Sequence, residues 1–151
     1  KENRDIPPLD YDRARRLAAT RGDLQIILNG GLDSKDQALA EADGFAGVML
    51  GRAAYRTPMV LANIAAQLFA TPIPARSAIA NGMADYADEA TATGVPLHSI
   101  TRHMLGLYHG QRGARLWRRR LGEDARNRTD GGTLIREVAA VCEMMNDALA
   151  A

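Results

Sequence analysis

Two short apolar stretches, each followed by glycine, decide the fold of this chain: IILNGG at residues 26–31 and GVMLGR at residues 47–52, where Arg52 comes directly after the glycine. Each is a nearly continuous run of aliphatic residues, which is typical of a strand in a sheet buried on both faces. The segment between them has helical spacing, and Ser34 with Gln37 fits a capping box at its start. The order strand, helix, strand predicts two parallel strands joined by a helix.

The first half of the chain alternates between helical and extended patterns. In chain order we expect a helix at 11–20, a strand at 25–29, a helix at 34–42, a strand at 47–50 and a helix from residue 53 onward. This half is therefore predicted to be an α/β domain, covering residues 1–70.

The second half has the pattern of an all-α domain. Two prolines in FATPIPARS mark a boundary between Phe69 and Ser77, and the clusters TGVP, HGQRG and RTDGG interrupt the helical pattern beyond it. The expected helices are 79–93, 99–109, 114–127 and 133–149. Breaks of this length connect antiparallel helices, so we predict a small four-helix bundle at residues 77–151.

Composition limits the classes of protein that fit. The chain has 151 residues, of which 46% are hydrophobic and 25% charged, the balance of a soluble globular protein. No apolar run approaches the roughly 18 residues of a membrane-spanning helix. The first residues, KENRDIPPLDYDR, lack the apolar core of a signal peptide. We therefore expect a cytoplasmic protein that makes no membrane contact.

The cysteine and histidine content points to no metal site and no nucleophile. The single cysteine, Cys142, excludes an internal disulfide, and its helical spacing with Val138 and Met145 indicates a packed position. The histidines have neither metal-ligand spacing nor a nucleophile nearby, so we assign them no catalytic role; they are His98, His103 and His109.

The net charge of +1 hides a basic region. Between His98 and Arg128 eight arginines stand against Glu123 and Asp124, a local charge of +6 that leaves −5 for the rest. These arginines are residues 102, 112, 115, 118, 119, 120, 126 and 128. Helical spacing separates Trp117 and Leu121 from most of them. Because the planar guanidinium suits phosphate, the basic side is either a phosphate-binding face or a solvated helix surface.

The glycines at the two strand ends suit an anion. Glycine lets bare backbone N–H groups approach a phosphate, and a following helix start adds partial positive charge. In (β/α)8 barrels the loops after the last two strands frequently build such a site, so Gly30–Gly31 and Gly51 would form its two sides, with Arg52 adding a charged donor. The alternative is that these glycines only permit turns and that Arg52 is a solvated charge. Spacing alone does not separate the two.

Four stretches resemble, in order, the carboxyl-terminal part of tRNA-dihydrouridine synthases of the A type. They are KENRDIPPLDYDR, LNGGL, DGFAGVMLGRAAYRTP and HSITRHMLGLYHGQRGARLWRRRLGE. The resemblance spans nearly the whole chain, and the last string is long and specific. It implies the final strands of an FMN-binding TIM barrel followed by a helical tRNA-binding domain. It also implies an enzyme that uses NADPH-reduced FMN to saturate the C5–C6 bond of uridine in the D-loop of tRNA.

The resemblance assigns roles to particular residues. The positions that would hold FMN are Asn29, Gly30, Gly31, Gly51 and Arg52. The positions that would contact tRNA are Lys1, Arg4, Arg115, Arg118 and Arg119. Within the family pattern GREAYxNP this chain has Ala53 for glutamate and Thr57 for asparagine. These departures lie beside the FMN phosphate clamp, so they bear on the helix start more than on the clamp.

Other parts of the family's site have no counterpart here. The family donates a proton from a cysteine on an earlier barrel loop, and a lysine and a histidine complete its flavin site. A full barrel takes roughly 250 residues. We therefore expect a carboxyl-terminal fragment that is inactive alone, associates with the missing barrel part or with itself, and has no catalytic residue of its own. The alternative function is a non-catalytic RNA-binding module.

Overall fold

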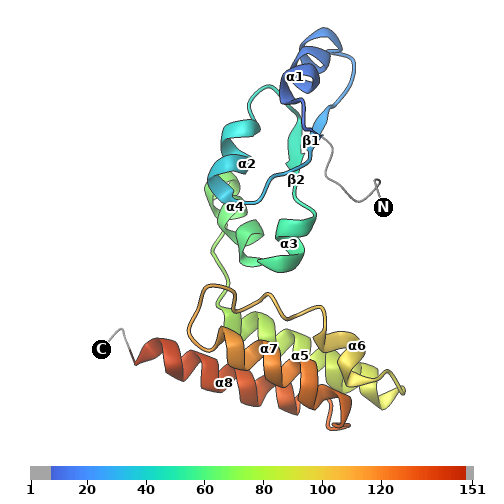
Figure 1. The fold of residues 1–151 in the computed structure, drawn as a ribbon, viewed down its shortest axis with the longest axis vertical. Coiled ribbons are helices and arrows are strands. Elements are labelled where there is room, and N and C mark those ends of the chain that lie inside the picture. Colours follow the sequence, from blue (N-terminus) through green and yellow to red (C-terminus); the bar gives the residue numbers. More distant parts are fainter. Residues whose placement is uncertain (1–7, 149–151) are drawn as a thin grey trace. The chain divides into compact units, whose positions relative to one another are not determined.

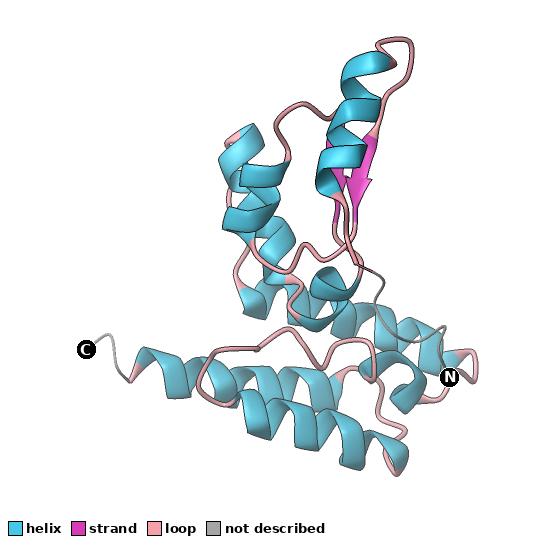
Figure 2. Cartoon of the chain, turned by 45° about the horizontal axis from the view of Figure 1, so that its top comes forward, coloured by secondary structure: helices cyan, strands magenta, loops and turns pink. Residues whose placement is uncertain are grey.

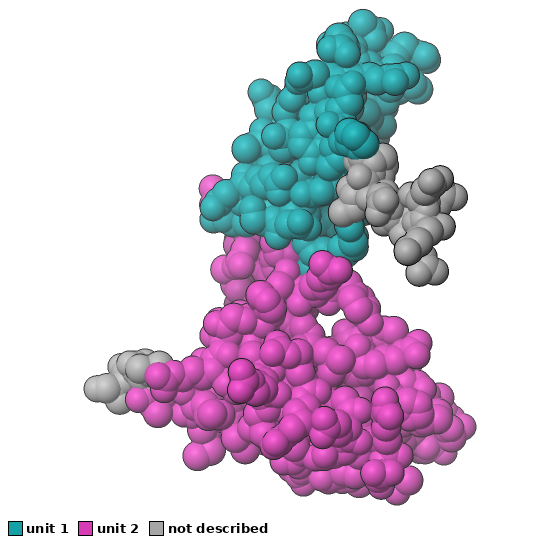
Figure 3. Space-filling view, in the orientation of Figure 1, with its two compact units in different colours: residues 1–54 teal, residues 55–151 magenta. Residues whose placement is uncertain are grey.

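A computed structural model describes residues 8–148 (Figures 1 and 2). The chain divides into two compact units, residues 1–54 and residues 55–151 (Figure 3). The elements are α1 Tyr11–Thr20, β1 Ile27–Asn29, α2 Lys35–Glu41, β2 Gly47–Met49, α3 Arg52–Arg56, α4 Met59–Phe69, α5 Arg76–Ala92, α6 Leu97–Thr101, α7 Ala114–Glu123, the 3-10 helix η2 Asp124–Arg126 and α8 Thr133–Asp147. None of the helices in this range is long and apolar enough to cross a membrane.

The first unit contains the predicted strand, helix, strand arrangement. β1 pairs with β2 in parallel, and Asn29 at the end of β1 lies opposite Met49 at the end of β2. The helix between them starts as predicted, because the Ser34 hydroxyl accepts a hydrogen bond from the Gln37 backbone N–H at 3.2 Å. The Gln37 side chain, however, accepts from the backbone N–H of Asp33 rather than of Ser34.

The sheet is covered less fully than its apolar strands suggested. Leu28 is buried, whereas Ile27 is 60% exposed and Met49 is 45% exposed. Successive residues of a strand point to opposite faces, so one face of β1 is packed and the other is open. The expectation of a sheet buried on both faces is therefore wrong for the residues described, which supply too few elements to cover both.

The second unit packs around α8, which lies against α5 and α7. Trp117 of α7 is fully buried, and its ring nitrogen donates to the Met104 carbonyl oxygen at 2.8 Å. Its ring packs at a tilt of 48° against that of Tyr108, with the ring centroids 4.7 Å apart. Tyr108 in turn donates to the Glu143 carboxylate at 2.5 Å. Burial, followed by this bond, raises the pKa of Tyr108 well above its ordinary value. Cys142 is also buried in this core, as its spacing predicted.

The four-helix bundle is not confirmed, because the second expected helix, residues 99–109, is mostly absent. α6 ends at Thr101, and the following residues form successive turns up to the start of α7. A Cβ added to Gly106 would lie 2.3 Å from the Arg56 carbonyl oxygen, while Gly110 and Gly113 have positive φ angles of 75° and 80°. The glycines therefore let this segment turn and approach the backbone of another segment closely.

An irregular segment joins α4 to α5 at the place where the prolines predicted a boundary. α4 ends at Phe69 and α5 begins at Arg76. The compact units nevertheless divide after residue 54, and Met59 of α4 belongs to the core of the second unit. The domain assignment of 1–70 and 77–151 stays a prediction.

Candidate functional site

The carboxyl ends of the two strands enclose a hollow of about 260 Å³, which we call the strand-end hollow. It brings together all five residues proposed for FMN. Its lining comprises Asn29, Gly30, Gly31, Leu32, Asp33, Met49, Gly51 and Arg52. The parallel register explains the convergence, since strands paired in parallel end at the same edge of a sheet.

The first pair of glycines is required by the backbone itself. Gly30 and Gly31 have φ angles of 131° and 64°, which residues with a Cβ rarely adopt. A Cβ added to Gly31 would also lie 2.5 Å from a methyl group of Leu9. The Tyr11 hydroxyl donates to the Gly30 carbonyl oxygen at 2.6 Å and holds the turn. These glycines would be needed with or without a ligand.

Gly51 is different, because nothing within the described chain requires a glycine there. Its φ is not among the positive values, and a Cβ added to it would make only an ordinary contact, 3.8 Å from the Met49 sulfur. Gly51 is exposed and lines the strand-end hollow. A missing side chain at such a position leaves the main chain uncovered, which suits the close approach of a ligand.

The charges at this hollow are mixed. Arg52, the first residue of α3, is exposed and makes no ion pair with a residue of the described range. A free guanidinium at the rim can hold a phosphate through charge-assisted hydrogen bonds. Asp33 also lines the hollow and repels an anion, so a phosphate would have to lie toward Arg52. The single arginine of this lining therefore suits one phosphate group.

The arginines of the second unit fall into two groups. Three form ion pairs: Arg120 with Asp124 and Glu137, Arg128 with Asp130 and Glu137, and Arg136 with Asp85 and Asp88. By contrast, the three arginines of α7 proposed for tRNA are all exposed and make no ion pair within residues 8–148; they are Arg115, Arg118 and Arg119. Their charges are available to an outside anion. Lys1 and Arg4, the other proposed tRNA contacts, lie outside the described residues.

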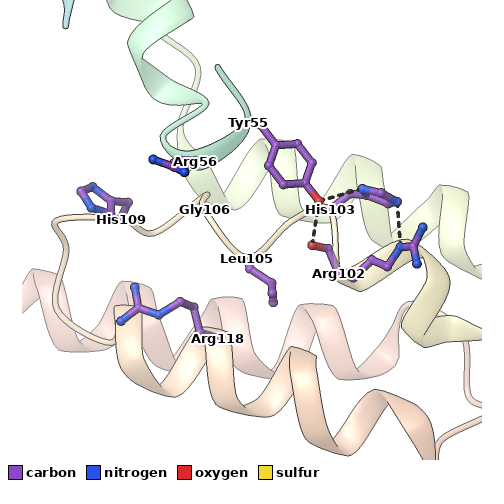
Figure 4. Close-up of a pocket in the computed structure, with 8 residues that line it drawn as sticks. All are labelled: Tyr55, Arg56, Arg102, His103, Leu105, Gly106, His109 and Arg118. Atoms are coloured by element: carbon purple, nitrogen blue, oxygen red, sulfur yellow. Dashed lines mark hydrogen bonds between the residues drawn. The ribbon is translucent and has the colours of Figure 1, made fainter. Parts of the chain in front are cut away.

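A second hollow, of about 320 Å³, lies wholly within the second unit, and we call it the Tyr55 hollow (Figure 4). Its lining comprises Tyr55, Arg56, Arg102, His103, Leu105, Gly106, His109 and Arg118. Among them only Arg118 was proposed from the sequence as a contact for tRNA. The sequence feature that could have indicated this hollow is Gly106 in HMLGLYHG. Because Gly106 has no side chain, its segment can lie close to the backbone of Tyr55 and Arg56.

No cluster of metal-ligating side chains occurs in the described part of the chain. Comparison with known families gives a clear match: the model for dihydrouridine synthases covers residues 1–146. The chain belongs to the dihydrouridine synthase family. A match over nearly the full sequence covers both the strand-end hollow and the basic face of α7.

Three relatives of this chain are each named tRNA-dihydrouridine(20/20a) synthase. The chain is 42% identical to the one from Vibrio parahaemolyticus over 142 residues, which is 93% of the chain and 44% of the relative. It is 42% identical to that from Xanthomonas campestris pv. campestris over 139 residues, or 92% and 42% of the two lengths. It is 44% identical to the relative from Pseudomonas putida over 126 residues, which is 82% of the chain and 38% of that relative. The chain spans less than half the length of these relatives.

Proposed function

We propose that this chain is part of a flavin-dependent tRNA-dihydrouridine synthase, an oxidoreductase that uses FMN and NADPH to reduce uridine to dihydrouridine in the D-loop of tRNA. The observation that carries the proposal is the strand-end hollow, where Asn29–Gly30–Gly31 and Gly51–Arg52 converge. The name shared by the relatives supports tRNA as the substrate. The two strands would then be the last strands of a (β/α)8 barrel, and the second unit the tRNA-binding domain.

The chain's own residues would bind and orient the cofactor. Arg52 supplies the charge for the phosphate group, and the uncovered main chain at Gly51 allows the phosphate to come close. Asn29 is exposed at the end of β1, where its amide can hydrogen-bond to the polar edge of a flavin. When bound and reduced, FMN supplies the hydride for the uracil ring.

The described residues offer no suitable cysteine as proton donor. Cys142 is buried, its thiol lies 3.6 Å from the Gly113 carbonyl oxygen, and burial raises its pKa. We therefore expect the 151-residue chain alone to form no dihydrouridine, while the longer protein that carries it does.

The test uses that intact protein with FMN, NADPH and unmodified tRNA. After digestion to nucleosides, mass spectrometry should detect uridine that has gained two hydrogen atoms. Omission of FMN or NADPH should abolish the product. If the intact protein binds tRNA but forms no dihydrouridine with both present, the function is that of a non-catalytic RNA-binding module. Turnover by the 151-residue chain alone would refute its proposed inactivity.

A further inference from the structure

The Tyr55 hollow is strongly cationic. Three of its lining residues are arginines, none carries a carboxylate, and two are histidines. Arg56 and Arg118 are exposed and form no ion pair with a residue in the described range, unlike Arg128, which two carboxylates hold. An exposed guanidinium without a carboxylate partner can form paired hydrogen bonds with a phosphate.

One end of this hollow carries an aromatic ring held in place. The Tyr55 hydroxyl lies 3.0 Å from His103 Nδ1, the rings meet edge to face at 5.8 Å, and Arg102 Nε donates to His103 Nε2 at 3.1 Å (Figure 4). Because Nε2 accepts from Arg102, the ring proton of His103 resides on Nδ1 and is donated to the tyrosine oxygen. Tyr55 is thereby fixed, although 56% of it is exposed.

An exposed aromatic ring beside free arginines matches the chemistry of an unpaired nucleotide. Bases that are not in a duplex stack on aromatic rings, while arginines hold their phosphates. A duplex would present phosphates without a free base face. Arg118 also connects this hollow to α7, since it lines the hollow and is the i+3 helical neighbour of Arg115.

We propose that the Tyr55 hollow binds one nucleotide of single-stranded RNA, its base against Tyr55 and its phosphate between Arg56 and Arg118. The inference rests on the proposed function for its choice of RNA as the partner. It adds a binding site that selects an unpaired nucleotide, where the basic face of α7 alone would attract any phosphate backbone.

The experiment measures binding by the intact protein to two labelled RNAs of equal length, a single-stranded oligonucleotide and a duplex, at several salt concentrations. Tyr55→Leu should weaken single-strand binding about 5- to 150-fold, the value of one stacked base, and leave duplex binding unchanged. Arg56→Gln should lower the logarithmic salt slope for the single strand by about 0.7.

The chain contains matched controls. Tyr86 is 54% exposed on α5, so Tyr86→Leu removes a similar ring outside the hollow. Arg16, exposed on α1, gives the same loss of charge in Arg16→Gln. Tyr55→Phe retains the ring and should bind nearly as well as the wild type. Circular dichroism checks the fold, and Arg56→Gln, an exposed change, keeps the test valid if Tyr55→Leu unfolds.

The inference is overturned if Tyr55→Leu behaves like Tyr86→Leu, if it weakens single strand and duplex equally, or if Arg56→Gln leaves the salt slope unchanged. Dihydrouridine formation is measured separately in the same preparations. Loss of single-strand selectivity in a variant of an inactive protein would support the hollow and reject the proposed function. If the wild-type protein forms dihydrouridine but the variants keep their selectivity for single-stranded RNA, the proposed function is supported and the nucleotide site in the Tyr55 hollow is rejected.

Discussion

The Asp88 carboxylate on α5 accepts a hydrogen bond of 2.7 Å from the backbone N–H of Gly132, 44 residues further along the chain. Its other oxygen forms an ion pair with Arg136 at 2.8 Å. A Cβ on Gly132 would lie 2.1 Å from the Ala84 carbonyl oxygen, so the start of α8 is in close backbone contact with α5. Asp88 thus connects the two helices near this close backbone contact.

This connection should make the second unit sensitive to acid. The Gly132 N–H, and then Arg136, lower the pKa of Asp88 in the folded protein. The stabilisation is therefore present above the unfolded pKa of about 3.9 and is lost as pH falls through the lower folded value. Asp88→Asn should lower stability at neutral pH and flatten its acid dependence. Urea unfolding followed by the fluorescence of Trp117, the single tryptophan, measures both.

Glu89→Gln is the control for Asp88→Asn, because Glu89 is an exposed acid on the same helix and forms no ion pair with a residue of the described range. It should leave both the midpoint and its pH dependence close to wild type. Equal acid sensitivity of wild type and Asp88→Asn would contradict the assignment.

Arg52→Gln in the intact protein should weaken FMN retention. A charge-assisted hydrogen bond contributes about 1.5 to 3 kcal/mol, or one to two decades in the dissociation constant. Titration of flavin fluorescence measures the change, and Arg16→Gln provides a control of equal charge. Unchanged flavin affinity in Arg52→Gln would mean that Arg52 is a solvated charge.

Replacing Arg115, Arg118 and Arg119 together with alanine should weaken tRNA binding and reduce its logarithmic salt dependence. Each lost phosphate contact should lower the slope by roughly 0.7 to 0.9, because fewer counterions are released. FMN affinity, measured on the same preparation, should not change. An unaltered salt slope would identify these arginines as a solvated surface, and loss of flavin would indicate a damaged fold.

The open face of the sheet should cause the 151-residue chain to self-associate when it is produced alone. Ile27 is 60% exposed on a strand of a two-stranded sheet, and such a strand offers apolar surface and unpaired backbone groups. Ile27→Thr should shift sedimentation equilibrium toward the monomer. Met144→Gln, a change at an exposed methionine of α8, should not. A wild-type chain that sediments as a clean monomer would disprove the expectation.

Local patterns predicted those features that neighbouring residues determine. The parallel strands, the Ser34 cap of α2 and the burial of Trp117 opposite the exposed arginines all follow from spacing within one element. The same spacing suggested a long helix over residues 99–109, which does not form. Its single glycine, Gly106, is explained by a close contact with the backbone of Arg56, 50 positions earlier in the chain, which no local pattern contains.

The candidate sites divide in the same way. The strand-end hollow could be predicted because glycine repeats at the ends of two strands that must be neighbours. The Tyr55 hollow could not, because Tyr55 and His103 are separated by 48 positions and neither residue type is distinctive alone. Likewise, only the folded chain distinguishes Arg118, which forms no ion pair within residues 8–148, from Arg120, which pairs with Asp124.

Because Cys142 is buried, the rate at which its thiol reacts with a reagent measures how often the second unit opens. The thiol packs against Gly113, so closely that a Cβ on that glycine would lie 2.8 Å from the sulfur, and the side chain has no exposed surface. A thiol-reactive dye can therefore label the single cysteine only when α8 and the start of α7 separate. The labelling rate, compared with and without bound RNA, would report how strongly a ligand on the opposite side of α7 holds the unit closed.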